Sequence, residues 1–302
     1  MKLSRITEHN MCIILLYAGG KDMYKILEKQ ILNPTVTKMV VEAPLVAKKA
    51  LAGQFIILRV HENGERIPLT IADYDREQGS VTIIFQIVGK TTMLLNELNE
   101  GDAILDFVGP LGKPSEVDGF KKVCVIGGGV GCAIAYPTAK ALYHNNTEVT
   151  VITGFRNKDL VILEDEFRNV SQHMYLMSDD GSAGEKGLVT NKLEELIQNG
   201  QEFDEVIAIG PLVMMKFVCL LTKKYNIKTV VSMNPIMIDG TGMCGCCRLS
   251  VGGETKFACV DGPDFDGHLV DFDEAISRSQ MYREFEAQAR DEHCNLFHKE
   301  VA

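Results

Sequence analysis

Apolar runs alternate with helical stretches over residues 119–234, and this alternation constrains the fold more than any other feature. The runs predicted as strands are Lys122–Ile126, Glu148–Thr153, His173–Ser178, Glu205–Ile209 and Lys228–Met233. The helical stretches are Ala133–His144, Leu160–Asn169, Val189–Asn199 and Leu212–Tyr225. Strands separated by helices are joined by crossover connections, which make them parallel in one sheet with helices on both faces. We therefore predict a doubly wound α/β domain over residues 119–234.

The stretch before it follows a different pattern, made of short strands without a long helix. Six β-type runs lie between Tyr24 and Val108, separated by turn residues such as Asn33-Pro34, and one short helix fits near Thr92–Leu98. Short strands at regular spacing are typical of a small antiparallel barrel. We therefore predict a six-stranded barrel over residues 23–118.

Residues 1–22 are interpreted as an N-terminal extension. Lys2 and Arg5 precede the apolar run Met11–Ala18, which faintly resembles a signal peptide, so secretion stays open as an alternative. The run is short and Glu8 lies in the would-be basic region, which favours the extension.

The charge balance narrows the choice of partners. The chain has 31 Lys and Arg against 41 Asp and Glu, a net charge of −10, and offers no basic footprint for nucleic acid. No apolar run approaches the roughly 20 residues that cross a bilayer. We expect neither nucleic acid nor a membrane as a partner.

Four of the nine cysteines lie close together, at Cys244, Cys246, Cys247 and Cys259. This clustering favours a metal or iron-sulfur site over a disulfide framework, and so a reducing compartment, for which the cytoplasm is the default. Plant-type ferredoxins hold a [2Fe-2S] cluster with the spacing C-x4-C-x2-C and a distant fourth cysteine. Cys244, Cys247 and Cys259 fit this spacing, and Asp239 stands where the first cysteine is expected.

A zinc site is the alternative, in which Cys244, Cys247, Cys259 and His268 form a tetrahedron without redox chemistry. In either case residues 235–270 are too few to form their own core, and a metal centre explains how they fold. A polar amphipathic helix, Asp273–Arg290, dominates the final stretch, residues 271–302.

A glycine run follows the first strand of the α/β domain and precedes a helix. Glycines at this turn let the backbone approach a pyrophosphate, whose charge is met by amides of the helix N-terminus, so Gly128, Gly129 and Gly131 are candidate nucleotide contacts. Arg156, after the second strand, suits a 2′-phosphate, whereas Asp159 nearby suits a free ribose diol, and NAD and NADP are not separated. Further candidates follow the third and fourth strands at the same sheet edge: Asp179, Gly210 and Pro211.

Two stretches of the barrel are candidates for a second ligand. The first places a cation, a rigid turn and a hydroxyl on one strand: Arg66, Pro68, Leu69 and Thr70. The second lies just before the short helix, where amides and hydroxyls suit a phosphate: Gly89, Lys90, Thr91 and Thr92.

Residues 23–293 resemble the flavin and iron-sulfur electron-transfer subunits of the ferredoxin-NADP reductase superfamily. The closest resemblance is to the small subunits of NADH-dependent reduced ferredoxin:NADP oxidoreductases, and dihydroorotate dehydrogenase B electron-transfer subunits are related. It rests on the motifs Arg66-Ile67-Pro68-Leu69-Thr70, Asp179-Asp180-Gly181-Ser182, Gly210-Pro211 and Asp239-Gly240-Thr241-Gly242-Met243-Cys244-Gly245-Cys246-Cys247.

The resemblance implies that the barrel binds FAD, the α/β domain binds NAD(H), and the cysteine segment carries [2Fe-2S] on Asp239, Cys244, Cys247 and Cys259. Electrons then move between these cofactors and on to a larger flavin and iron-sulfur catalytic subunit, and no side chain acts as a catalytic acid or nucleophile. Two departures stand out. One extra residue separates Arg66 from Thr70, and Asp239 replaces a cysteine that the dihydroorotate-linked relatives use.

Two alternatives remain open. In the first, the same electron-transfer module serves another partner, in a dihydroorotate dehydrogenase, a sulfide dehydrogenase or a glutamate synthase-like enzyme. The other belongs to a different class, a non-catalytic nucleotide-binding protein with structural zinc.

Overall fold

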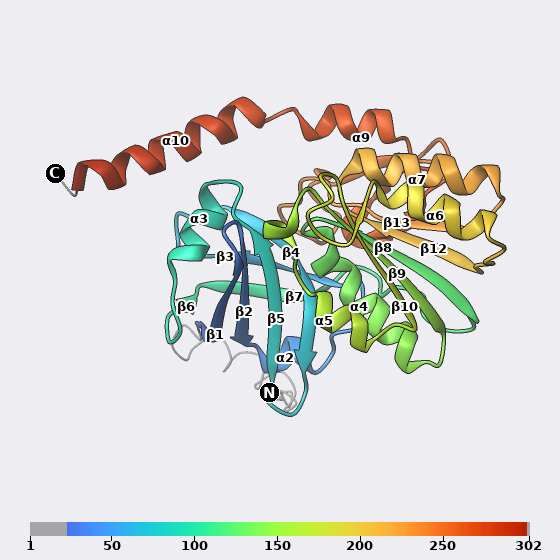
Figure 1. Cartoon of the computed structure of the whole chain (residues 1–302). Helices are drawn as coiled ribbons and strands as arrows, with labels where there is room; N and C mark the ends of the chain where they lie inside the picture. The colour runs from blue at the N-terminus through green and yellow to red at the C-terminus, as the bar shows by residue number, and fades with distance from the viewer. Residues whose placement is uncertain (1–22, 301–302) are drawn as a thin grey trace, which may run out of the picture.

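The computed structural model describes residues 23–300, so the expected extension over residues 1–22 lies outside the described residues. A barrel, a parallel sheet and a small C-terminal segment lie side by side (Figure 1). This is the predicted fold class, an antiparallel β-barrel beside a doubly wound α/β domain. Among residues 23–300, no helix combines the length and the apolar character needed to span a membrane.

The barrel has seven antiparallel strands in the order β6-β1-β2-β5-β4-β3-β7. Their bounds are β1 Tyr24–Asn33, β2 Val36–Glu42, β3 Phe55–Arg59, β4 Arg66–Asp75, β5 Ser80–Gln86, β6 Ala103–Ile104 and β7 Asp106–Leu111. Helices α2 (Pro44–Ala47) and α3 (Lys90–Glu97) complete it. Phe85, Phe107 and Ile83 are fully buried at its centre, where alternate residues of each strand point inward.

The strand count differs from the prediction by one, because the run Ala103–Val108 divides into two strands. β6 pairs with β1 at one edge of the sheet, whereas β7 pairs with β3 at the other. Between them the Leu105 amide donates to the Val60 carbonyl, at 3.3 Å. The chain thus crosses from one edge to the other within a few residues, which nearly closes the barrel.

The second sheet has the order β11-β10-β9-β8-β12-β13-β16 and is parallel except for β16. Its strands are β8 Lys122–Gly128, β9 Glu148–Phe155, β10 His173–Ser178, β11 Glu185–Lys186, β12 Glu205–Ile209, β13 Thr229–Ser232 and β16 Asp264–Asp266. β8 and β12 are almost wholly buried, as central strands of a sheet covered on both faces are.

Helices connect these strands as predicted, with one difference. They are α4 Gly131–His144, α5 Glu164–Asn169, α6 Val189–Gln198 and α7 Leu212–Lys224. The stretch expected as a helix over Leu160–Asn169 starts with a short 3₁₀ turn, Lys158–Leu160, and only α5 is α-helical. Leu163, between the two, has a left-handed backbone (φ 59°), which no residue inside a right-handed helix adopts.

Helix α4 joins the two larger parts, because it packs on β8 and also against β4 of the barrel. Lys140 on α4 pairs with Asp73 on β4, with Nζ 2.7 Å from Oδ2. An ion pair this exposed contributes little stability, about 0 to 1 kcal/mol. The packing of α4 on β4 is therefore the main contact between the sheet domain and the barrel, and the ion pair lies within it.

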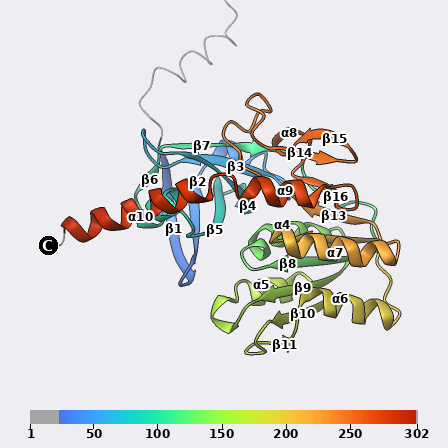
Figure 2. The ribbon, with the colours of Figure 1, turned by 90° about the horizontal axis from the view of Figure 1, so that it is seen from above.

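The C-terminal segment leaves the parallel sheet after β13 and returns to it as β16. Between them lie the hairpin β14 (Arg248–Val251) and β15 (Glu254–Phe257) and the short helix α8 (Ala258–Asp261). The predicted helix Asp273–Arg290 is two helices, α9 (Phe272–Ser279) and α10 (Arg283–Glu300), because tight turns at Gln280 and Met281 interrupt it. Seen from above, α9 lies beside α7, whereas α10 runs out past the barrel (Figure 2).

Candidate functional site

The loop over residues 239–247 holds three of the four candidate cluster ligands, Asp239, Cys244 and Cys247, and the fourth, Cys259, lies on α8. Gly240, Gly242 and Gly245 all have left-handed backbones, with φ of 74°, 83° and 67°, which glycine adopts without strain. The Asp239 carboxylate accepts hydrogen bonds from the amides of Thr241 (3.0 Å) and Cys244 (2.9 Å). These bonds, the Thr241 bond first, lower the pKa of Asp239 below its ordinary value. Asp239 is therefore anionic at neutral pH, as a metal ligand must be.

The four candidate donors form two pairs. Asp239 is tied to the backbone of Cys244, whose side chain is exposed, while the Sγ atoms of Cys247 and Cys259 lie 3.2 Å apart and are buried. Burial raises the pKa of Cys259 to about 12, and a hydrogen bond from the Gly242 backbone opposes this shift. Because thiolates are the ligands, metal binding at this pair has to displace protons.

This arrangement fits a two-iron cluster better than a single ion. In a [2Fe-2S] cluster four protein ligands are shared between two irons, so two pairs of donors are expected. A structural zinc instead needs four donors around one point. Among the side chains that the structure describes, residues 23–292, no three of His, Cys, Asp or Glu form a group that could hold a metal ion. The ring of His268, a ligand of the zinc alternative, lies 3.0 Å from the Thr222 hydroxyl on α7.

The cluster loop packs directly on the barrel. A Cβ atom at Gly240 would lie 2.7 Å from Leu111 on β7 and 2.8 Å from Ile57 on β3. Gly240 therefore needs both its left-handed backbone and its missing side chain. The close approach places the candidate cluster site next to the barrel strands.

The predicted nucleotide glycines meet at the centre of the parallel sheet, where β8 and β12 end. This is the switch point of the strand order, at which doubly wound sheets bind ligands. A Cβ at Gly131 would lie 2.5 Å from the Ile209 carbonyl oxygen and 2.7 Å from the Gly210 Cα, and one at Gly210 would lie 3.1 Å from Gly128. Gly129 has φ of 56°. The glycines thus allow helix α4 and the two strand ends to approach closely.

Arg156 and Asp179 lie further along the same edge, on adjoining loops after β9 and β10. The Asp179 amide donates to the carbonyl of Phe155, the neighbour of Arg156. The Ser182 hydroxyl donates to Asp180 (2.6 Å) and accepts from the Lys158 amide (2.8 Å), so the two loops are joined. Both candidate side chains are exposed.

The four candidates on β4 do not share one face. Ile67 and Leu69 pack against the core of the barrel, so Arg66, Pro68 and Thr70 alternate with them and face outward. The Leu69 side chain is therefore directed away from a ligand on the outer face, and only its backbone is available there.

At the start of α3 the two threonine hydroxyls already have protein partners. Thr91 Oγ1 donates to Glu65 Oε2 (3.1 Å), and Thr92 Oγ1 donates to the Gly89 carbonyl while accepting from the Gly89 amide. No atom lies within 4 Å of a Cβ built at Gly89. The open space at this helix start fits a phosphate. The groups free to contact a phosphate are the amides of Lys90 and Thr91 and the Lys90 side chain.

Sequence reasoning missed two features of these sites. Met214 on α7 lies directly over Gly128 and Gly210, where its thioether fills the space that two missing side chains leave. Met214 belongs to a pair of methionines on a helix, and such pairs usually pack in a protein core. The sequence alone therefore did not indicate its place over the two glycines. The second feature is a polar contact between Ser115 and Asp264, which no sequence spacing indicates.

Comparison with known proteins agrees with this geometry. The model of the oxidoreductase NAD-binding domain matches residues 125–220, and that of the iron-sulfur cluster binding domain of dihydroorotate dehydrogenase B matches residues 234–271. With the barrel, these domains define a ferredoxin-NADP reductase-like oxidoreductase that transfers electrons with FAD, NAD(H) and an iron-sulfur cluster.

Full-length relatives narrow the class to a family. The chain is 47% identical over 268 residues to the dihydroorotate dehydrogenase B electron transfer subunit homolog of Thermotoga maritima, covering 89% of this chain and 94% of the relative. It is 32% identical over 262 residues to the dihydroorotate dehydrogenase B electron transfer subunit of Streptococcus mutans, covering 83% and 98%. The chain belongs to this family of electron-transfer subunits.

A solved structure is similar over nearly the whole chain. It is that of an NADH-dependent reduced ferredoxin-NADP oxidoreductase, described for flavin-based electron bifurcation, with 45% identity and a TM-score of 0.86. The match covers 91% of this chain and 99% of that chain.

Proposed function

We propose that this chain transfers electrons between NAD(H), FAD and a [2Fe-2S] cluster held by Asp239, Cys244, Cys247 and Cys259, and passes them to a larger flavin and iron-sulfur subunit. The domains would be residues 23–118 for FAD, 119–234 for the nucleotide, 235–270 for the cluster and 271–302 for the C-terminal helices. The observation that carries the proposal is the contact of Gly240 with Ile57 and Leu111, which brings the cluster loop against the barrel. The cytoplasm is the proposed compartment.

Bound FAD would supply the conversion between paired and single electrons. Oxidation of one NADH to NAD⁺ releases two electrons, so two single transfers to the partner complete a turnover. The chain's own residues bind and position: Gly129, whose surroundings are open, would admit the nucleotide, Gly128, Gly131 and Gly210 would hold α4 close to the strand ends, the start of α3 would hold phosphate, and the Asp239 loop would hold the cluster. None of these roles requires a side chain to move a proton.

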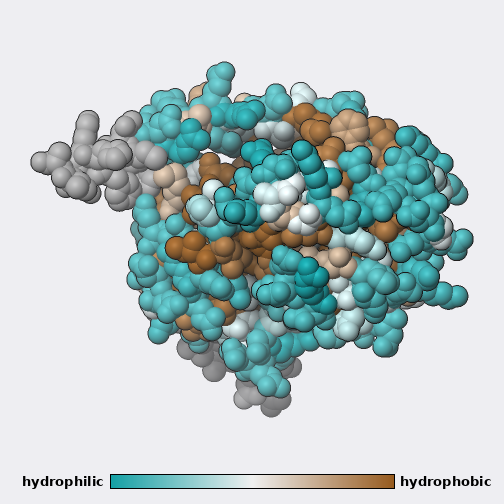
Figure 3. Space-filling view, in the orientation of Figure 1, coloured by the Kyte–Doolittle hydropathy of each residue, from teal (hydrophilic) through white to brown (hydrophobic). Residues whose placement is uncertain are grey.

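Exposed apolar residues around the cluster loop support a protein partner. Met243, next to Cys244, is 89% exposed, and Ile236, Ile238 and Val260 are also exposed. A second apolar stripe follows one face of α7, at Val213, Phe217 and Leu220, toward the upper right of Figure 3. Contiguous exposed apolar surface of this kind marks interaction sites. We infer that the larger subunit covers Cys244 and receives electrons there.

The bifurcating type of complex is favoured over a dihydroorotate dehydrogenase. Asp239 occupies the first ligand position, and the similar solved structure, matched over almost its full length, is of the bifurcating kind. The family's dihydroorotate dehydrogenase B members, at 32% identity, keep that enzyme as the second candidate.

The native complex distinguishes the two candidates. Anaerobically purified with its co-purifying partner, the complex should use NADH together with ferredoxin and NADP, and should not reduce NAD⁺ with dihydroorotate. Dihydroorotate oxidation would establish the second candidate.

The Met243→Asp variant tests the partner surface. It should lose the partner while keeping its flavin and iron content. Leu45→Asp, on the exposed outer side of α2, is the matched control.

A further inference from the structure

The cluster-bearing segment is a loop whose two ends meet. The Met233 amide donates to the Pro263 carbonyl at 2.9 Å, and Ser232 on β13 pairs with Asp264 on β16. All four candidate cluster ligands lie between these ends. The base of the loop is therefore a single place, at the edge of the parallel sheet.

The Asp264 carboxyl group occupies this base and binds two different parts of the molecule. Its Oδ2 accepts from the Ser115 hydroxyl at 2.5 Å, and Ser232, its pairing partner on β13, also lowers the pKa of the carboxyl group. Ser115 belongs to the linker between β7 and β8, whereas Ser232 belongs to the sheet. One carboxyl group thus connects the loop base with the barrel's linker and with the sheet.

The linker itself is fixed to the barrel. The Ser115 amide donates to the Ala52 carbonyl (2.9 Å), and the Lys113 amide donates to the Gly262 carbonyl (2.7 Å). Gly53 has φ of 81°, and a Cβ there would overlap Ser115. Ser115 Oγ also lies 3.3 Å from the Thr138 hydroxyl on α4. A displacement of Asp264 would therefore change contacts of the barrel, the sheet and the cluster loop together.

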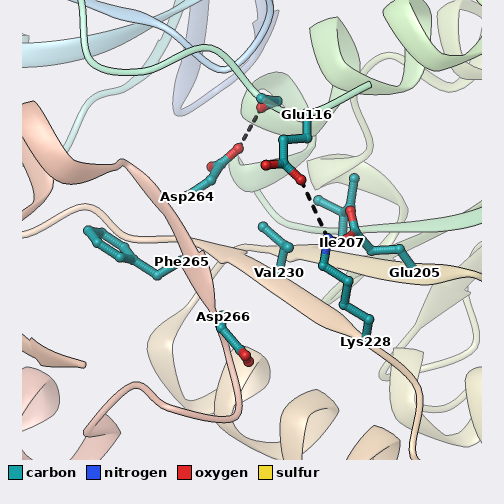
Figure 4. A pocket seen from close by; sticks show the side chains of 9 residues that line it. Glu116, Glu205, Ile207, Lys228, Val230, Asp264, Phe265 and Asp266 are labelled. Atoms are coloured by element: carbon teal, nitrogen blue, oxygen red, sulfur yellow. Dashed lines mark hydrogen bonds and ion pairs between the residues drawn. The ribbon is translucent and has the colours of Figure 1, made fainter. Parts of the chain in front are cut away.

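Charged groups surround Asp264 without pairing with it. A small pocket beside it is lined by Glu116, Glu205, Lys228 and Asp266 (Figure 4). Lys228 Nζ lies 2.7 Å from Glu205 and 3.5 Å from Glu116, so its charge is committed to them. Among the described side chains, residues 23–292, no Lys, Arg or His forms an ion pair with Asp264. The pocket lies where β12 and β13 begin, at the edge opposite the nucleotide glycines.

Asp264 is half-buried, and desolvation raises the pKa of its carboxyl group against the opposing effect of its two serine partners. A buried carboxyl without a cation costs stability unless it is hydrogen-bonded. An apolar residue could fill the space, but it could not bind both serines.

We propose that Asp264 is a positioning residue for electron transfer, which holds the cluster loop at a fixed distance from the barrel through Ser115 and Ser232. This inference rests on the proposed function for its role in electron transfer. The clamp itself is made by the chain's own side chains, and its existence is tested apart from that role.

Ser115→Ala tests the clamp, because it removes the side-chain link between Asp264 and the linker and leaves Ser232 and the backbone bond from Lys113 to Gly262 in place. A hydrogen bond to a charged group contributes about 1.5 to 3 kcal/mol, so opening of the loop should become about 10-fold to 150-fold more frequent. Hydrogen exchange of amides in residues 233–263 of the purified protein measures this. Ser171→Ala is the matched control, since it removes a serine bond to Phe167 elsewhere in the sheet domain.

The loaded protein gives the second readout. In Ser115→Ala the FAD and iron contents and the rate of flavin reduction by NADH should equal those of wild type, while cluster reduction, followed by EPR after rapid freezing, slows severalfold. Asp264→Ala should show the same split more strongly, and Asp264→Asn, which keeps an acceptor oxygen, should restore most of the rate.

Two results would overturn the inference: exchange in residues 233–263 that Ser115→Ala does not change, or an equal slowing of flavin and cluster reduction. If wild-type protein binds neither flavin nor cluster, the proposed function fails, whereas the exchange result still decides whether the clamp exists.

Discussion

Replacement of Gly240 by alanine is the sharpest perturbation that the structure offers. The change adds one methyl group at a left-handed residue, and that methyl group would meet Leu111 at 2.7 Å and Ile57 at 2.8 Å. A left-handed backbone costs a non-glycine residue about 1 to 2 kcal/mol. Overpacking against β3 and β7 adds about 1 to 3 kcal/mol.

Gly253 provides the control that separates these two costs. It lies in the turn between β14 and β15 of the same segment, has φ of 81°, and has no atom within 4 Å of a built Cβ. Gly253→Ala therefore carries the backbone cost alone. The difference between the variants is the contact with the barrel, about 1 to 3 kcal/mol, or about a 5-fold to 150-fold difference in loop opening.

The assay compares hydrogen exchange in residues 237–250 of the two variants, together with iron content and the rate of cluster reduction. Gly240→Ala should exchange faster than Gly253→Ala and should reduce its cluster more slowly, because the loop is pushed away from the barrel. Equal exchange and equal rates in the two variants would refute the close contact between loop and barrel.

Three further predictions concern the other sites. Gly131→Ala should raise the KM for NADH about tenfold or more at unchanged FAD content, because its Cβ would lie 2.5 Å from the Ile209 carbonyl oxygen; an unchanged KM would argue against nucleotide binding at this turn. Asp179→Asn should lower the preference for NADH over NADPH, measured as the ratio of kcat/KM values, because it removes a negative charge that would face a 2′-phosphate; a constant ratio would contradict this. The raised pKa of Asp264 means that the folded state binds its proton more tightly than the unfolded state, so the free energy of unfolding should fall as pH rises from about 4 toward 7. In Asp264→Asn this fall in the free energy of unfolding, measured by urea titration, should be smaller. An equal fall would mean that other groups cause it, among them Glu205, because burial also raises the pKa of Glu205.

Local patterns predicted the elements of the parallel sheet because each one depends on its own residues. The run of buried apolar residues marks β8, and the following glycines must lie at its end because α4 begins immediately. The candidate cluster donors stay a prediction, and the structure adds that Asp239, Cys244 and Cys247 belong to one loop with three left-handed glycines.

Contacts between distant residues lay beyond sequence reasoning. Ser115 and Asp264 are 149 positions apart, and neither belongs to a motif. Which residues of β4 face outward depends on its register with β3, and this register directs Leu69 into the core. The motif Arg66–Thr70 alone could therefore not tell which of its side chains face a ligand. The same holds for Thr91 and Thr92, whose hydroxyls are used within the protein.

The account rests on the passage of electrons from a nicotinamide to an iron-sulfur centre within one chain. The most direct measurement adds NADH to anaerobically purified protein and follows the flavin by absorbance and the cluster by EPR. We predict that the flavin absorbance falls and that the signal of a reduced two-iron cluster grows in the same sample. A protein that contains both cofactors but shows no cluster signal after its flavin has been reduced would contradict the account.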